Sequence, residues 1–97
     1  MIPSLSDKEY RVLDLLRAGG EMYGLEMVKA SEGSLKRGTI YVTLNRMIEK
    51  GFLEDREEKD PTLPGMPRRK YRISGHGQRV LNASDAAAAV FCGVAHD

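Results

Sequence analysis

The sequence predicts a mainly α (α+β) domain made of three helices, a two-stranded hairpin and a fourth, C-terminal helix. In the first half, apolar residues recur at the spacing of one helical face. After Gly51 the pattern changes to the alternation typical of strands, in residues 52–57 and 70–74. The last segment is rich in alanine, which favours a helix. The 97 residues are enough for one domain with a modest core.

The first helix is predicted over residues 7–18. Ser6 and Glu9 form a capping box, S-D-K-E, at its start, and Gly19 follows its end. The residues expected to face inward are Val12, Leu13 and Leu16. A second, shorter helix is predicted over residues 24–31. Its inward residues are expected to be Leu25 and Val28.

A third helix is predicted over residues 38–50, in the middle of the chain. Gly51 follows it, where glycine suits a left-handed C-cap. Its apolar face comprises Ile40, Leu44, Met47 and Ile48. The opposite face carries Thr39, Val42, Asn45, Arg46 and Glu49. Lys36 and Arg37 precede the helix, and their positive charges suit its N-terminus to contact with a polyanion. The alternative is an ordinary core helix with a solvated outer face.

Residues 52–57 and 70–74 are predicted to be the two strands of a hairpin. Tyr71 and Ile73 share one face of the second strand. The tip contains residues that interrupt regular structure, namely Pro61, Pro64, Gly65 and Pro67. The second and third helices form a helix-turn-helix, whose second helix is the one that enters a DNA groove. With the hairpin as a wing, the predicted fold is a winged helix-turn-helix.

Charge is segregated along the chain although the net charge is only +1. Residues 34–48 contain three cations and no acid, residues 54–60 contain five acids and two bases, and residues 66–81 contain five bases and no acid. Such segregation indicates a polyanionic partner better than the net charge does. Cross-strand pairing between the acidic and the basic strand of the hairpin is the structural alternative.

The last segment is predicted to be a helix that is secure only from Gln78, because glycines occupy positions 75 and 77. Residues 1–75 would then be the winged helix-turn-helix domain and residues 76–97 a dimerisation helix. Its apolar side comprises Val80, Leu81, Ala87, Val90, Phe91 and Val94. We expect this side to form a homodimer, since exposed apolar patches on small domains commonly mark interfaces. Packing of the helix on its own domain is the alternative.

The sequence does not indicate an enzyme, and we expect no catalytic, cofactor-binding or metal-binding residue. Cys92 and His96 are one helical turn apart, but a structural zinc site needs four ligands. The single cysteine excludes an internal disulfide and fits a reducing compartment. The N-terminal residues show no signal-peptide pattern, so we expect no signal peptide, and no apolar run approaches the ~20 residues that span a bilayer. We therefore expect a cytoplasmic protein with no membrane partner.

In order and spacing, several motifs resemble the PadR-type transcriptional regulators in their short-tailed form, over residues 5–81. The motifs are Tyr23-Gly24, Gly38-Thr39-Ile40-Tyr41 with Leu44 and Arg46, Gly51-Phe52-Leu53, and residues 67–74 followed by Gly77. The family usually has proline where this chain has Val42. The resemblance implies a homodimeric repressor whose terminal helix makes the dimer. Family members often respond to small aromatic or toxic compounds, so a small-molecule effector is an open expectation.

The sequence therefore predicts a regulator that binds an inverted-repeat operator in double-stranded DNA as a homodimer. The third helix would approach the major groove and the wing the backbone or minor groove, with most of the affinity coming from phosphates. The expected DNA-contacting residues are Lys36, Arg37, Thr39, Tyr41, Val42, Asn45, Arg46, Arg68, Arg69 and Lys70. The rival interpretation is a winged-helix module whose basic wing docks on an acidic protein.

Overall fold

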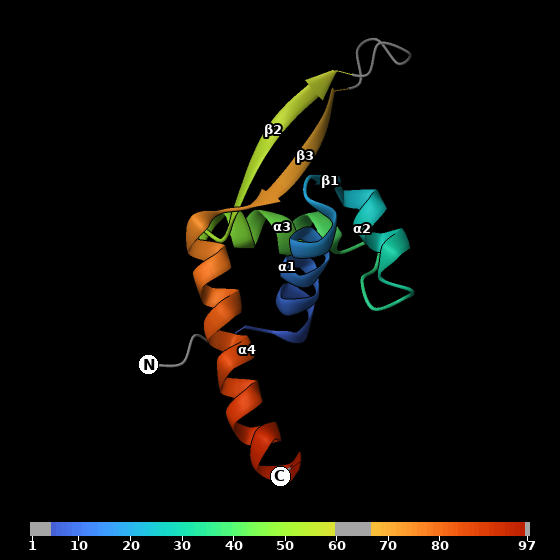
Figure 1. The fold of residues 1–97 in the computed structure, drawn as a ribbon. Coiled ribbons are helices and arrows are strands. Elements are labelled where there is room, and N and C mark those ends of the chain that lie inside the picture. The colour runs from blue at the N-terminus through green and yellow to red at the C-terminus, as the bar shows by residue number, and fades with distance from the viewer. Residues whose placement is uncertain (1–4, 60–66, 97) are drawn as a thin grey trace.

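The computed structural model describes residues 5–59 and 67–96; for residues 59, 67 and 88–96 it describes the backbone alone. Its elements are α1 (Asp7–Gly19), β1 (Met22–Tyr23), α2 (Gly24–Ala30), α3 (Ile40–Glu49), β2 (Leu53–Lys59), β3 (Pro67–Ile73) and α4 (Gly75–His96). Helices α1, α2 and α3 form the body of the fold, and β2 and β3 rise from one end of it as the wing. Helix α4 begins at the base of the wing and runs past the body in the opposite direction (Figure 1). The predicted winged helix-turn-helix is confirmed.

Helix α1 begins with the predicted capping box. The Ser6 hydroxyl accepts a hydrogen bond from the Glu9 N–H at 3.1 Å, and the Glu9 carboxylate accepts one from the Ser6 N–H at 3.0 Å. Glu9 also pairs with Lys50 Nζ at 2.7 Å. Burial raises the pKa of Glu9, but the hydrogen bonds from Lys50 and Ser6 outweigh it and leave this pKa below its usual value. The pair ties the start of α1 to the end of α3.

Helix α2 is oriented differently from the prediction. Leu25 is 37 % exposed and Val28 is only partly buried, whereas Met27 is fully buried. A seven-residue helix has room for only one strongly inward position per turn, and starting at Gly24 gives that position to Met27. The prediction that Leu25 faces the core is therefore wrong.

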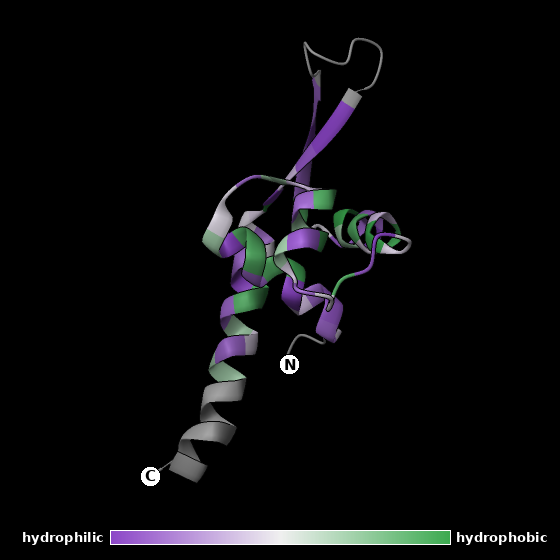
Figure 2. Ribbon diagram, turned by 90° about the vertical axis from the view of Figure 1, so that its right-hand side faces the viewer, coloured by the Kyte–Doolittle hydropathy of each residue, from purple (hydrophilic) through white to green (hydrophobic). Residues whose placement is uncertain are grey.

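The predicted two-stranded hairpin is confirmed but belongs to a three-stranded antiparallel sheet, in the order β1-β3-β2. Strand β1 pairs through Met22 with Tyr71 and through Tyr23 with Lys70. In the hairpin, the Cα register runs from Leu53 opposite Ile73 to residue 59 opposite residue 67. Figure 2 shows the two strands of the wing as hydrophilic over most of their length, so the wing is held at its base.

Helix α4 begins at Gly75, three residues before the predicted secure start. The Ser74 hydroxyl accepts a hydrogen bond from the Gly77 N–H at 2.9 Å and donates one to the Gly51 carbonyl at 2.6 Å. The Ser74 N–H donates to the Phe52 carbonyl at 3.0 Å. This cap and its tertiary contacts outweigh the low helix propensity of the glycines. Gly51, with φ of 78°, makes the predicted turn into the wing.

The core includes two residues that the sequence assigns to a dimer surface. Val80 is 6 % exposed and Leu81 is fully buried, because the first turns of α4 pack against α1. They are therefore core residues of their own domain. The other buried apolar residues are Val12, Leu13, Leu16, Met27, Leu35, Ile40, Leu44, Met47, Phe52, Leu53 and Tyr71.

A polar cluster holds α4 against α1 just beyond those core residues. The Tyr10 hydroxyl donates to the Asp85 carboxylate at 2.5 Å, and Arg17 pairs with both Asp85 and Asp14. The hydrogen bonds from Tyr10 and Arg17 hold the pKa of Asp85 below its usual value. Ala87, on the next turn, is half-buried, and the side chains of Val90, Phe91 and Val94 lie outside the description. None of the helices in the described ranges could cross a bilayer by its length and apolar character.

Candidate nucleic-acid interface

Helix α3 divides sharply into a buried and an exposed face. Ile40, Leu44 and Met47 are at most 1 % exposed, and Ile48 packs partly against the same core. The exposed face, which we call the outer face of α3, comprises Tyr41, Val42, Asn45, Arg46 and Glu49. The 3.6-residue period of the sequence predicts this division, apart from Tyr41.

The turn before α3 adds exposed cations to the outer face. Lys36, Arg37 and Thr39 are all exposed, and the turn is closed by hydrogen bonds from the N–H groups of Thr39 and Ile40 to the Lys36 carbonyl. Within the described part of the chain, Lys36, Arg37 and Arg46 form no ion pair. Their charges are thus available to a polyanion without breaking an existing pair.

Tyr41 is fixed by its contact with the start of α2. A Cβ atom added to Gly24 would lie 2.9 Å from Cε1 of the Tyr41 ring, so the ring lies directly on the glycine backbone. Tyr41 nevertheless stays 46 % exposed. The glycine therefore lets α2 and α3 approach closely while the Tyr41 ring remains on the outer surface.

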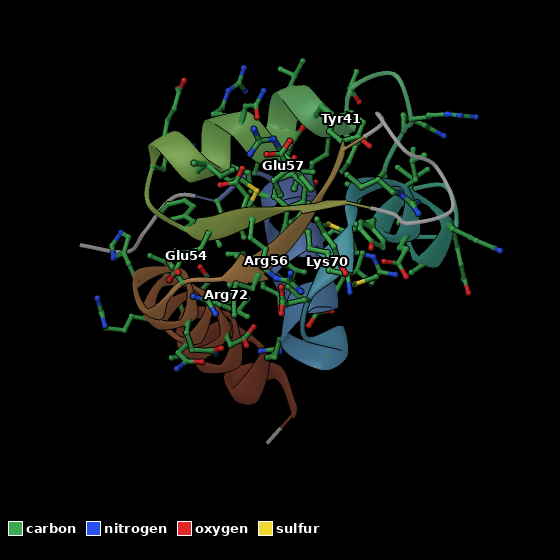
Figure 3. The ribbon with its side chains drawn as sticks, turned by 90° about the horizontal axis from the view of Figure 1, so that it is seen from above. Tyr41, Glu54, Arg56, Glu57, Lys70 and Arg72 are labelled. Carbon is green, nitrogen blue, oxygen red and sulfur yellow. The ribbon has the colours of Figure 1, made fainter. Side chains whose placement is uncertain are left out.

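The wing has two faces, and they carry different charges. Figure 3 shows Tyr41 and Glu57 on the α3 side of the sheet, and Glu54, Arg56, Lys70 and Arg72 on the far side. Because side chains alternate along a strand, Asp55 and Arg69 belong with Glu57 on the α3 side. Arg69 Nη1 pairs there with Asp55 Oδ2 at 2.9 Å.

On the far side, three cations of the described wing are paired with acids. Arg72 pairs with Glu54 at 2.8 Å and Lys70 with Glu58 at 3.6 Å. Arg56 pairs with Glu21 at 2.6 Å, and its hydrogen bond lowers the pKa of Glu21. The cross-strand pairing that the sequence left as an alternative is thus present in the wing.

Arg68 and Lys70 also lie over an aromatic ring. The Arg68 guanidinium is 4.2 Å and the Lys70 ammonium 5.0 Å from the centroid of Tyr23, which are cation–π distances. Tyr23 occupies this place because β1 pairs with β3, which the sequence did not reveal. A hollow of about 130 Å³ lies between the wing and the helices, lined by Tyr23, Leu25, Tyr41, Arg68 and Arg69.

The structure therefore brings together part of the predicted DNA-contacting set. Seven residues lie on the outer face of α3 or the turn before it: Lys36, Arg37, Thr39, Tyr41, Val42, Asn45 and Arg46. Of the wing cations, Arg69 lies on the α3 side of the sheet, whereas Arg68 and Lys70 lie on its far side. The strict alternation of a strand could have separated Arg69 from its two neighbours. The sequence did not indicate that Leu25 and Tyr23 line this hollow. The position of Leu25 depends on how α2 is oriented, and that of Tyr23 depends on the pairing of β1 with β3.

The match to a protein-family model identifies the family of this chain. Residues 12–83 match the model described as the Transcriptional regulator PadR-like family, which covers more than half of the chain. The chain belongs to this family. The PadR-like family is a family of transcriptional regulators, and no curated protein sequence matches the chain. The described residues contain no group of three or more His, Cys, Asp or Glu side chains placed to hold a metal ion.

Solved PadR structures share the fold of this PadR-like protein. A PadR family transcriptional regulator from Eggerthella lenta DSM 2243 is 29 % identical, with a TM-score of 0.73 over 90 % of this chain and 76 % of that one. A PadR family transcription regulator from Clostridium difficile R20291 is 23 % identical, with a TM-score of 0.74 over 88 % and 90 %. Bacillus subtilis PadR, solved in complex with operator DNA, is 24 % identical, with a TM-score of 0.72 over 81 % and 46 %.

Proposed function

We propose that this PadR-like protein is a sequence-specific DNA-binding regulator that inserts the outer face of α3 into the major groove. One observation carries the proposal: the outer face and the turn before it expose Lys36, Arg37 and Arg46 without acidic partners in the described structure. Polar and apolar groups suited to base edges lie between these cations. Bacillus subtilis PadR, which has the same fold, was solved in complex with operator DNA, and this supports DNA binding by the present chain.

In this proposal the wing contributes phosphate contacts. Arg69 lies on the α3 side and is 56 % exposed at its side chain, so it can turn from Asp55 to a phosphate. Arg68 and Lys70 are held over Tyr23 near the same edge of the sheet. Every such contact requires an exchange of partners, which makes the wing a weaker anchor than the helix. The protein would act where the chromosome lies, in the cytoplasm.

We further propose that the protein is a homodimeric repressor that binds an inverted repeat, with α4 as the dimer element. The core uses Val80 and Leu81, so the interface would begin at Ala87 and continue through Val90, Phe91 and Val94. The polar cluster around Asp85 supports this by fixing the direction in which α4 leaves the body. Two α3 helices would then read half-sites roughly 34–36 Å apart.

DNA binding is tested by selecting fragments from a random pool and measuring affinity at several salt concentrations. We expect a palindromic motif, and an affinity for it at least about 10³-fold above that for random DNA. The affinity should fall steeply with salt, by a slope of about −0.9 per neutralised phosphate. If no motif is enriched and salt has little effect, the wing and helix serve as a protein-interaction module instead.

The dimer is tested by sedimentation of the wild-type protein and of Phe91→Asp. A carboxylate cannot be buried in an apolar interface without a partner, so the variant should shift to monomer and lose its preference for the palindrome. Weak, salt-dependent binding to random DNA should survive. If both proteins sediment as the same species, α4 is not the interface.

A further inference from the structure

Val42 is an exposed apolar side chain on the outer face of α3. It is 60 % exposed, more than Tyr41 at 46 % or Leu25 at 37 %. The core does not use it, because Ile40 and Leu44 fill the inner face of the same turns of α3. A β-branched residue also has no particular helix propensity to justify its place on a solvated surface. Val42 is therefore free to contact a partner.

The surroundings of Val42 restrict that partner to a polyanion with an apolar group on it. Residues 34–48 carry no acid, and the exposed cations Lys36, Arg37 and Arg46 lie before and after Val42 along the chain. An apolar protein surface would leave these three charges without counter-charges. Asn45, one turn further along the same face, adds an amide that can read a base edge.

DNA offers one apolar group to a helix in the major groove, and it is the C5 methyl of thymine. Val42 is the third residue of α3, and the N-terminal residues of a recognition helix are those that face base edges. We propose, building on the DNA-binding function above, that Val42 reads a thymine methyl in each half-site. The bases under the first turn of α3 thus include an A·T pair whose thymine faces Val42.

The test replaces each thymine of the selected half-site by uracil, one at a time, which removes only the methyl group. At one position this should weaken binding by about fourfold, the value expected for one buried methyl. Val42→Ala should weaken binding to the thymine operator by a similar factor and be insensitive to uracil at that position. Arg46→Ala is the matched control, because it should weaken binding while keeping the full sensitivity to uracil.

5-Methylcytosine carries the same C5 methyl group as thymine. A second series of operators therefore separates recognition of the methyl group from recognition of the A·T pair itself. Replacing the A·T pair by G·C should weaken binding, and methylating that cytosine at C5 should restore only the methyl contribution, by about fourfold. Val42 is exposed, so Val42→Ala should unfold at the same temperature as the wild type, which thermal melting checks.

The outcomes distinguish this inference from the function on which it rests. If an operator is selected but uracil is neutral at every position, Val42 reads no methyl, and the DNA-binding function stands. The same conclusion follows if Val42→Ala keeps the sensitivity to uracil. If the random pool yields no operator, the DNA-binding function fails and the reading of thymine fails with it.

Discussion

The outer face of α3 and the wing both carry cations, but they hold them in opposite states. Lys36, Arg37 and Arg46 have no acidic partner in the described structure, whereas Arg69 and Arg72 are paired with acids of β2. An unpaired cation gains the full benefit of a phosphate, while a paired one gains only the difference between two partners. We therefore expect the helix to supply more affinity per cation than the wing, although the wing is richer in arginine.

The two surfaces can act together only if the base of the wing is fixed, and Gly77 lies at that base. A Cβ atom at Gly77 would lie 2.0 Å from the Phe52 carbonyl oxygen, a contact that requires the backbone to move. We expect Gly77→Ala to lower the free energy of unfolding by about 3 kcal/mol or more, measured by urea denaturation.

Gly75→Ala is the matched control in the same turn of α4. Its Cβ atom would lie 3.6 Å from the end of the flexible Arg79 side chain, which is an ordinary contact. This variant should be as stable as the wild type or up to about 1 kcal/mol more stable, because alanine favours the helix. If the two variants are equally stable, the wing and α4 are not locked together at Gly77.

The second largest effect is expected on the outer face of α3. Arg46→Ala should cost about 1–3 kcal/mol of binding free energy at the selected operator and far less on random DNA, if the side chain reads a base. Thr39→Ala should behave in the same way. Equal losses on both DNAs would make the residue a phosphate contact, and titrations on the two DNAs at one salt concentration separate these roles.

Much of the structure of α1 and α3 could be predicted from the sequence. The capping box of Ser6 and Glu9, the inner face of α3 and the turn at Gly51 are local patterns, and the structure has all three. The exposure of the outer face follows from the same 3.6-residue period. Local hydrogen bonds and periodicity determine these features, so no knowledge of distant contacts was needed.

The features that the sequence did not reveal depend on distant contacts. Strand β1 has two residues, too few to show an alternation, and its partner Tyr71 is far along the chain. Helix α4 starts early because Ser74 is buried against the turn at Gly51, which propensity alone does not capture. The opposite charges of β2 and β3 suggested pairing, but only the structure shows which acid each cation pairs with, Asp55 for Arg69 and Glu54 for Arg72.

A smaller effect is expected from the acid that competes with DNA for Arg69. Asp55→Asn removes the carboxylate that pairs with Arg69 at 2.9 Å, and with it a negative charge on the α3 side. Binding to operator and random DNA should tighten by up to about 1 kcal/mol at low salt, the range of an exposed ion pair, and the gain should shrink at high salt.

Glu54→Gln is the control for this change, since Glu54 is the adjacent residue of β2 but lies on the far side (Figure 3). It removes the same charge without freeing Arg69, so it should tighten binding less than Asp55→Asn. Equal gains from the two variants would mean that the total charge of the wing matters and the Arg69–Asp55 pair does not.

The smallest effect is expected for Arg72, a cation of the wing on the far side of the sheet from the outer face of α3 (Figure 3). Its side chain is 60 % exposed, and it pairs with Glu54, which is 52 % exposed. Arg72→Ala should leave the free energy of unfolding nearly unchanged, as for other exposed pairs, and should leave the salt dependence of DNA binding unchanged. Titrations at several salt concentrations measure that slope. A slope that becomes shallower by about 0.9 would mean that Arg72 contacts a phosphate. In that case DNA approaches the far side of the wing, and the proposed phosphate contact of Arg69 on the α3 side would be wrong.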